Sequence, residues 1–353
     1  MRRPSGVDLA LQEQRIHQLA RDAGFDLAGV AAAGPVADFP IYESWTASGY
    51  QASMAYLTGR RAGLRADPRM LLAGARSVIC VAKLYNTPYP QSNQCDPGTG
   101  WISRYGWGED YHDVLRRGLA RLRGALEAEY GTFESKICVD TAPLLERSLA
   151  RQAGLGWIGK NTCLINQQQG SWFFLGELIT SLDLRPDAPP PDRCGTCSRC
   201  IDACPTDALV PAAGGGWTLD SGLCISHQTI ELRGPIEPVA RSRNGHHVFG
   251  CDICQEVCPW NRHAPDTADA EFHPAFGSFP PNLAELGGLC EAEFDARFAR
   301  TPVARARYRG FLRNVVIAMG NQPLPEYRPI LERLAAHVDP VVAEHAVWAL
   351  GRL

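Results

Sequence analysis

The stretch that decides the fold is Cys194-Gly195-Thr196-Cys197-Ser198-Arg199-Cys200-Ile201-Asp202-Ala203-Cys204-Pro205, near the middle of a chain of 353 residues. Its cysteines follow the spacing C-x2-C-x2-C-x3-C-P, which is typical of modules that hold two [4Fe-4S] clusters, with the fourth cysteine serving the other cluster. Because the gaps are so short, three thiolates of one tight loop can converge on a cubane. The stretch therefore predicts a compact two-cluster module.

A second group of cysteines further along the chain completes this module. Cys251-Asp252-Ile253-Cys254 is followed by Cys258-Pro259, and Cys224 lies upstream. Four-cysteine zinc sites normally use two separated pairs and not a triplet with a shared fourth residue, so zinc is the weaker interpretation. Crossed pairing, as in bacterial ferredoxins, assigns Cys194, Cys197, Cys200 and Cys258 to one cluster and Cys204, Cys224, Cys251 and Cys254 to the other.

The remaining cysteines carry no assigned role. The chain has 13 cysteines and no apolar export signal at its start, and reduced cytosolic thiols favour metal ligation over disulfides. Cys80, Cys138 and Cys163 lie in apolar runs and are expected to be small buried side chains. Cys95, in a Pro- and Gly-rich loop, could be either reactive or inert, and Cys290 is uninformative.

Composition places the chain among ordinary globular proteins with more than one domain, since 45% of its residues are hydrophobic and 21% are charged. No apolar run is long enough to span a bilayer, so we expect a cytoplasmic protein without a membrane partner. The formal net charge of -3 offers no overall attraction to nucleic acid. An RNA partner would therefore need a local basic surface.

Helix and strand patterns divide the chain into an α+β protein of three parts. The Pro-rich run 184–192 cannot continue a helix or a central strand, and it separates a domain over 1–184 from the cysteine module over 185–270. Residues 271–353 are expected to be helical, with short paired helices similar to a HEAT repeat.

The first part is expected to contain a sheet covered by helices. We expect Asp140, which precedes Thr141 and Pro143, to cap a helix start. Hydrophobic periodicity predicts helices over 7–23 and 110–130 and strands over 25–30, 77–85, 136–139 and 172–180.

Several longer motifs carry a resemblance to a known family. They are Val139-Asp140-Thr141-Ala142-Pro143-Leu144-Leu145-Glu146-Arg147, Gly154-Leu155-Gly156-Trp157-Ile158-Gly159-Lys160-Asn161-Thr162, Cys224-Ile225-Ser226-His227 and Gly250-Cys251-Asp252-Ile253-Cys254-Gln255-Glu256-Val257-Cys258-Pro259-Trp260-Asn261. In this order, and with Asp110-Tyr111-His112, they resemble the epoxyqueuosine reductases. The resemblance covers nearly the whole chain.

The resemblance implies a reaction and its cofactors. It implies reductive removal of the epoxide oxygen from epoxyqueuosine at the wobble position of tRNA, the last step of queuosine synthesis. It also implies base-off cobalamin in an N-terminal domain of nitroreductase-like or cobalamin-processing type. Electrons would reach cobalamin through the two clusters from an external flavodoxin, ferredoxin or reductase.

The resemblance also suggests site residues. Asp140 matches the family's proton donor, and burial beside a corrin would raise its pKa toward the working range. His112 either lines the substrate pocket or packs at a helix start. Because Leu115 stands where the D-x-H-x-x-G word of some corrinoid proteins has glycine, we expect no lower histidine ligand. The candidate cobalamin contacts are Arg60, Asp140, Lys160 and Ser226.

A local basic surface is present near the C-terminus. From Arg297 to Leu353 there are nine arginines against four acidic residues, which suits phosphate contacts. A solvated helix face is the alternative interpretation. The candidate tRNA contacts are Arg233, Arg305, Arg307, Arg309 and Arg313.

Two other functions remain open at this point. A corrinoid reductive dehalogenase shares cobalamin and two cubanes but acts on small organohalides and is normally exported. A ferredoxin-like electron carrier would have no chemistry of its own, and a lack of bound corrinoid would favour it.

Overall fold

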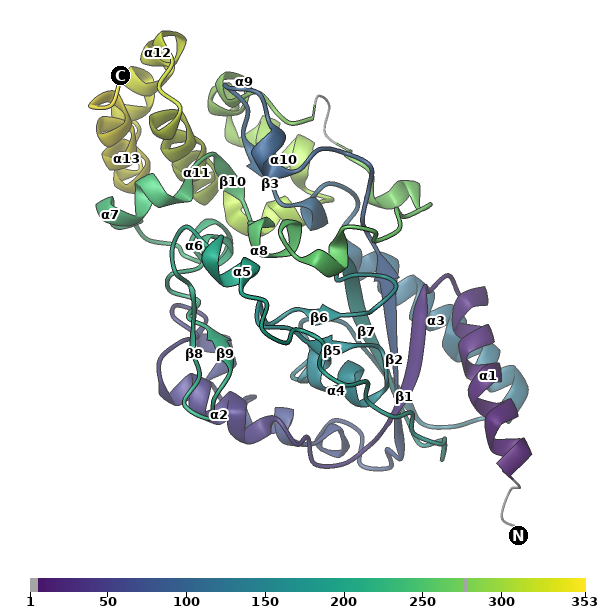
Figure 1. Cartoon of the computed structure of the whole chain (residues 1–353). Helices are drawn as coiled ribbons and strands as arrows, with labels where there is room; N and C mark the ends of the chain where they lie inside the picture. The colour runs from purple at the N-terminus through teal and green to yellow at the C-terminus, as the bar shows by residue number, and fades with distance from the viewer. Residues whose placement is uncertain (1–5, 276–278) are drawn as a thin grey trace.

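The computed structural model describes residues 6–275 and 279–353, and its first part is built on an antiparallel sheet (Figure 1). The strand order is β1-β2-β7-β4. The two central strands are buried along nearly their whole length, as expected for apolar runs. The bounds are β1 Leu27–Ala32, β2 Ser77–Leu84, β7 Phe173–Thr180 and β4 Ser135–Cys138.

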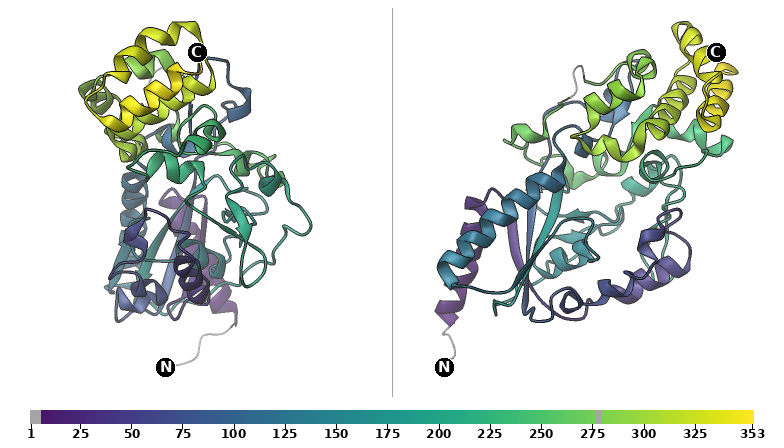
Figure 2. Two further views of the ribbon diagram at one scale, coloured as in Figure 1. Left: turned by 90° about the vertical axis from the view of Figure 1, so that its left-hand side faces the viewer. Right: turned by 180° about the vertical axis from the view of Figure 1, so that it is seen from behind.

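Helices cover both faces of this sheet. Helices α1 (Gly6–Asp22) and α3 (Tyr111–Tyr130) lie side by side on one face, as the view from behind shows (Figure 2). The leucine stripe of α3 packs there against strand residues such as Ile79. The short helix α4 (Glu146–Gln152) packs on the opposite face, against β1, β2 and β7. The loop that precedes α4 on this face carries Asp140, a candidate site residue.

The cysteine module follows the Pro-rich run and consists of short elements. Within it, β8 (Leu209–Pro211) and β9 (Trp217–Leu219) form a hairpin. Another hairpin, β5 (Trp157–Ile158) with β6 (Leu164–Ile165), lies before the module in the chain. One-turn or two-turn helices follow the cysteines, namely α5 Arg199–Asp202, α6 Ile225–Ile230, α7 Pro238–Arg241 and α8 Ile253–Glu256.

The C-terminal helices share a core with distant segments. Strand β3 (Trp101–Ile102) pairs in parallel with β10 (His247–Phe249), and both pack in the core under the C-terminal helices. Asp252 is buried and accepts bonds from Trp101 Nε1 at 3.1 Å and from Ser103 Oγ at 2.5 Å. The helices are α9 Leu283–Gly288, α10 Glu291–Phe298, α11 Arg307–Asn321, α12 Arg328–Ala335 and α13 Pro340–Leu350.

A second long-range contact ties the N-terminal part to the module. Helix α2 (Phe39–Ala47) reaches the β8–β9 hairpin, where Trp45 Nε1 donates to Leu219 O at 2.6 Å. Just beyond the helix, Ser221 N donates to Tyr50 O at 2.9 Å. Segments of the first part therefore pack against the cysteine module and in the core of the C-terminal helices.

The expected helices and strands are present within one or two residues of their predicted ends, and the chain mixes helix and sheet. One expectation is wrong: Asp140 does not cap α4, whose N-cap is Leu145 without a side-chain cap. The side chain of Asp140 is instead drawn to His112, at 3.1 Å. Within the described ranges, no helix is both long and apolar enough to cross a membrane.

Candidate active site

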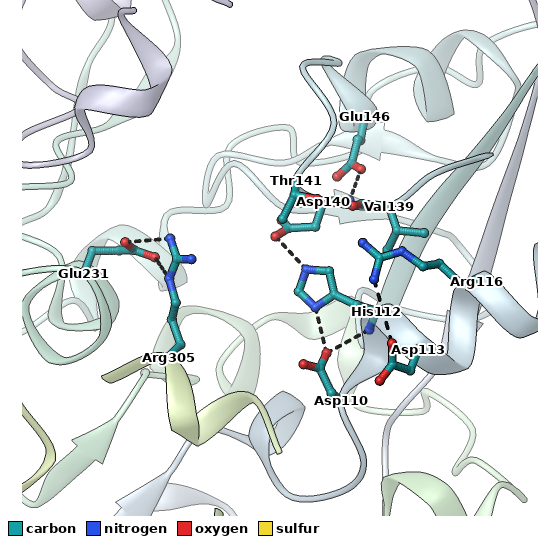
Figure 3. A network of polar contacts seen from close by, with 10 residues as sticks. All are labelled: Asp110, His112, Asp113, Arg116, Val139, Asp140, Thr141, Glu146, Glu231 and Arg305. Carbon is teal, nitrogen blue, oxygen red and sulfur yellow. Dashed lines mark hydrogen bonds and ion pairs between the residues drawn. The ribbon is translucent and has the colours of Figure 1, made fainter. Parts of the chain in front are cut away.

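Asp140 lies in the loop that joins β4 to α4. Its φ of 49° is in the left-handed region, which aspartate tolerates better than most residues. Its backbone N–H donates to Glu146 Oε1 at 2.5 Å, so the loop is held from behind by the first residue of α4. The Asp140 side chain is 53% exposed and points toward the start of α3 (Figure 3).

His112 lies between two carboxylates. Asp110 caps α3 by accepting from His112 N at 2.9 Å, and its Oδ1 is also 2.7 Å from His112 Nδ1. On the other side of the ring, His112 Nε2 is 3.1 Å from Asp140 Oδ2. Asp110, His112 and Asp140 therefore form a continuous polar chain that ends at the exposed carboxyl (Figure 3).

The electrostatics of this chain place the proton on the ring. Burial alone would lower the pKa of His112, but hydrogen bonds and charge from Asp110 and Asp140 raise it to about 9. Burial would raise the pKa of Asp140, yet His112, Tyr111 and Arg305 together bring it below the usual value. In the chain without a corrin His112 outweighs burial, and the rise of the Asp140 pKa beside a corrin stays a prediction.

Aromatic rings and an ion pair surround the exposed carboxyl. Tyr111 stacks on Phe174, with ring centroids 4.4 Å apart, and on His112, at 4.2 Å. Across the open space in Figure 3, Arg305 is paired with Glu231, with Nε 3.0 Å from Oε1. Although it is paired with Glu231, Arg305 contributes positive potential at Asp140 and helps to keep that carboxyl ionised.

The first group of predicted cluster ligands is brought together. Burial raises the pKa of Cys200 to about 11, and the neighbouring thiols of Cys258, Cys194 and Cys197 add to the effect. The same burial and the Cys194 thiol raise the pKa of Cys258. A bound iron would remove this penalty by holding the thiolates, so the donor set fits a cluster.

The second group is also brought together. Burial raises the pKa of Cys251 well above its usual value, with contributions from Cys224 and Cys204. The pKa of Cys254 is raised first by a hydrogen bond with Cys163 and then by burial, with Cys251 and Cys224 adding to it. Each thiol of the predicted second set therefore interacts with at least two others of the set.

The other cysteines differ in their surroundings. Cys80 and Cys138 are buried in the sheet, as expected. Cys163 is not simply a packed side chain, because its thiol contacts Cys254. Burial raises the pKa of Cys95 to about 11, which does not suit a reactive thiol. Cys290 is exposed at the start of α10.

The candidate cobalamin contacts fall into different positions. The Lys160 ammonium donates to Gly195 O at 2.7 Å and Cys197 O at 2.9 Å, so it braces the first cysteine loop. The Ser226 hydroxyl faces the Cys224 thiol. Arg60 is exposed in the segment after α2.

The predicted tRNA arginines separate into buried and exposed groups. Arg313 is only 1% exposed, and its guanidinium donates to the backbone oxygens of Gln228, Leu232 and Gly234. A phosphate contact by Arg313 is therefore wrong, because this residue faces inward from α11 and satisfies buried carbonyls. Arg233 is exposed, but its guanidinium donates to the carbonyls of residues 305 and 306.

The exposed arginines lie together ahead of and on α11. Arg305, Arg307 and Arg309 are all exposed. Arg305 is paired with Glu231, and Arg309 Nε is 3.1 Å from Asp339 Oδ2. Arg307 has a φ of 58°, and no ion pair is formed by its side chain within the described residues.

Comparison with known proteins decides the family. Residues 65–141 match the model described as "Epoxyqueuosine reductase QueG, DUF1730". The chain is 38% identical over 354 aligned positions to the epoxyqueuosine reductase of Xanthomonas campestris pv. campestris, covering 99% of this chain and 98% of that protein. The chain belongs to the epoxyqueuosine reductase family. A second relative with the same name, from Pseudomonas aeruginosa, is 39% identical and covers 99% of this chain and 96% of that protein.

Solved epoxyqueuosine reductases share the fold. One, in complex with an epoxyqueuosine-modified tRNA stem loop, superposes with a TM-score of 0.86 at 28% identity and covers 98% of this chain and 90% of that one. Another, from Bacillus subtilis, has its catalytic aspartate loop swung out of the active site and gives 0.85 at 27% identity, covering 98% and 91%. This chain thus has the epoxyqueuosine reductase fold.

The cysteine module of this chain matches the 4Fe-4S double cluster binding domain over residues 193–261. It therefore binds two [4Fe-4S] clusters, and the zinc interpretation is set aside.

The site residues to which the sequence analysis gave no role are mainly acidic and aromatic. Glu146 and Glu177 lie behind the site. Tyr111 and Tyr56 line it, and the Arg305 guanidinium lies 5.9 Å from the centre of the Tyr56 ring. One available signal was Glu177 itself, a lone acid within the otherwise apolar strand β7.

Proposed function

We propose that this chain reduces epoxyqueuosine to queuosine at the wobble position of tRNA, the last step of queuosine biosynthesis. The reaction consumes two electrons and two protons, breaks both C–O bonds of the epoxide, forms the C=C bond and releases water. The observation that carries the proposal is the near full-length identity to proteins named epoxyqueuosine reductase. The polar chain that ends at Asp140 supplies the acid this reaction needs.

The cysteine module holds the electron relay. One cluster takes Cys194, Cys197, Cys200 and Cys258, and the other takes Cys204, Cys224, Cys251 and Cys254. The mutual effects among the thiols within each set support this division. An external flavodoxin, ferredoxin or reductase is the source of the electrons.

Cobalamin, when bound, supplies the cobalt centre that reduces the epoxide. Both ring nitrogens of His112 are engaged by carboxylates, which fits base-off binding without a histidine ligand. Arg60, Asp140 and Ser226 would hold the corrin. Lys160 would have to leave two backbone carbonyls to join them, so its primary task is to brace the loop of the first cluster.

The protein's own part in the chemistry is proton delivery. At neutral pH the shared proton resides on His112, whose pKa is about 9, while Asp140 is ionised. Asp140 faces the ligand space and passes this proton to the epoxide oxygen as its C–O bond breaks. Asp110 holds the ring in the orientation that makes this transfer possible.

The tRNA backbone is bound at the exposed arginines before and on α11. Arg305, Arg307 and Arg309 are accessible for phosphate, and Arg233 shapes this surface through the carbonyls of residues 305 and 306. Arg305 also lies close enough to act electrostatically on Asp140. This position would bring a bound anticodon loop over the acid.

We assign a different role to each of three segments of the chain. Residues 1–184 form the cobalamin domain of nitroreductase-like or cobalamin-processing type, 185–270 the ferredoxin-like domain and 271–353 the HEAT-like, tRNA-binding domain. The pairing of β3 with β10 joins the first two segments beneath the third. We place the reaction in the cytoplasm, where thiols stay reduced.

Anaerobic turnover of epoxyqueuosine-containing tRNA tests the proposal. The cluster-reconstituted protein is given a chemical reductant, with and without cobalamin, and the digested nucleosides are identified by mass. Queuosine that forms only with cobalamin is the expected result. No product from protein that has bound both clusters and corrinoid would overturn the proposed substrate, and no corrinoid binding would favour the electron-carrier class.

A further inference from the structure

A buried acid lies behind the candidate site. Glu177 is 0% exposed in the central strand β7, where it is flanked by Cys80 on β2 and Cys138 on β4. Within the described parts of the chain, neither of its carboxyl oxygens receives a hydrogen bond from an N–H or hydroxyl group. A carboxylate without a donor is costly in such a place, so Glu177 is held as the neutral acid.

The neighbour of Glu177 is the carboxyl of Glu146. Burial raises the pKa of Glu177 well above its usual value, and the adjacent Glu146 carboxyl adds to that rise. Two carboxyl groups can form a hydrogen bond only if one of them carries a proton. Helix α4 packs against β7, which brings its first residue, Glu146, to Glu177, so a hydrogen bond between the two carboxyls requires one shared proton.

The same Glu146 carboxyl holds the loop of Asp140. Its Oε1 accepts the Asp140 backbone N–H at 2.5 Å, and Asp140 adopts a φ of 49° there (Figure 3). This left-handed conformation is unfavourable for most non-glycine residues and persists only where surrounding contacts impose it. The Glu146 acceptor is one such contact.

We propose that Glu146 and Glu177 form a proton-sharing latch that keeps the Asp140 loop facing the ligand space. The inference rests on the proposed function and deepens it, since both glutamates act through Asp140 as positioning residues. The solved Bacillus subtilis relative with its catalytic aspartate loop swung out shows that a loop of this kind can leave its site in that protein.

The groups around the two glutamates determine which carboxyl keeps the proton. Asp140 and Arg147 are the charged neighbours of Glu146, and the thiols of Cys80 and Cys138 flank Glu177. Burial and the Asp140 charge raise the pKa of Glu146 to about 8. Above that pH Glu146 is ionised while Glu177 remains the neutral acid, so the pair still shares one proton and Glu146 still accepts the Asp140 N–H.

Amide and alanine substitutions separate the latch from a merely structural role. In Glu146→Gln the amide oxygen still accepts from Asp140 N–H, while its NH2 donates to Glu177, so no shared proton is needed. In Glu146→Ala the acceptor is lost. Glu127→Ala, at an exposed position on α3, is the control for a general effect of removing a glutamate.

Hydrogen exchange of the Asp140 amide is the first readout, measured on the cluster-loaded full chain as a protection factor corrected for intrinsic exchange. The wild type is expected to stay protected from pH 7 to pH 9, because ionised Glu146 still accepts the Asp140 N–H and Glu177 keeps the shared proton. Glu146→Gln is expected to stay protected over that range, and Glu146→Ala to be unprotected throughout. The Glu127→Ala control should match the wild type.

Turnover is the second readout. Glu146→Ala is expected to lower kcat by about 100-fold with little change in KM for tRNA, since a misplaced acid costs about that much. Glu146→Gln should recover most of the loss. Equal protection in Glu146→Ala and wild type would overturn the latch, even in protein that makes queuosine. Absence of queuosine from wild type with a protected Asp140 amide would instead count against the proposed function alone.

Discussion

His112 Nε2 lies 3.1 Å from Asp140 Oδ2, and this contact determines where the site keeps its proton. A histidine with a pKa of about 9 is charged at neutral pH, so the paired carboxylate needs no raised pKa to take part in acid catalysis. The two residues act as one acid, and their titration belongs to the pair.

The pH dependence of turnover follows from this pair. Because the His112 pKa is raised from 6.5 to about 9, we expect kcat to be sustained to about pH 8 and to fall as pH passes through 9. The free energy of unfolding that the charged ring contributes is fully present below pH 6.5, and it is lost as the pH rises through about 9. Chemical denaturation at pH 6 and pH 10 would measure that loss, and His112→Gln should abolish the difference that this ring contributes.

Replacing the acid itself should separate chemistry from cofactor binding. Asp140→Asn keeps the size of the side chain and the contacts of Arg60 and Ser226, so it is expected to retain its iron and its corrinoid. It should lower kcat by about 100-fold or more, the usual contribution of general acid catalysis. Iron analysis, the corrinoid absorption spectrum and nucleoside mass analysis check the three properties on one sample. Wild-type turnover in this variant would remove Asp140 from the acid role.

The cluster ligands can be distinguished from the other cysteines by iron content. Cys197→Ala and Cys251→Ala are each expected to lose the iron of one cluster, because each removes a thiolate from a different set of four. Cys290→Ala is the matched control, since that thiol is exposed at the start of α10 and belongs to neither set of four. Full iron in Cys197→Ala would contradict the assignment of ligands.

The cluster module was predictable because its information is local. Short cysteine gaps determine which thiols meet whatever the rest of the chain does. The cap of α13 is local in the same way: Asp339, directly before Pro340, accepts from Val341 N at 2.9 Å within one turn. Such features depend on contacts between near neighbours in sequence.

The polar chain of the site was not predictable in this way. Asp140 precedes Thr141 and Pro143, which locally favours a helix cap, but a histidine 28 residues away competes for its side chain. The latch likewise joins Glu146 to Glu177 across the sheet. Sequence proximity gave no information on either pairing, although the family motifs pointed to Asp140.

Arg313 and Arg307 show why charge density alone does not locate a tRNA contact. Six residues apart, one is buried against backbone carbonyls and the other is exposed. Arg307→Ala should weaken tRNA binding and reduce the salt slope of log K by about one. Filter binding over a range of salt concentrations checks this, and an unchanged slope would exclude a phosphate contact.

Arg313→Ala is expected to act on stability instead. It leaves the carbonyls of Gln228, Leu232 and Gly234 without their donor, a loss on the order of 3 kcal/mol for several buried acceptors. Urea unfolding of the cluster-loaded protein should therefore shift to lower concentration. In the fraction that remains folded, the salt slope of tRNA binding should equal that of the wild type, because the lost guanidinium never reached a phosphate. A reduced slope with unchanged stability would reverse the roles assigned to these two arginines.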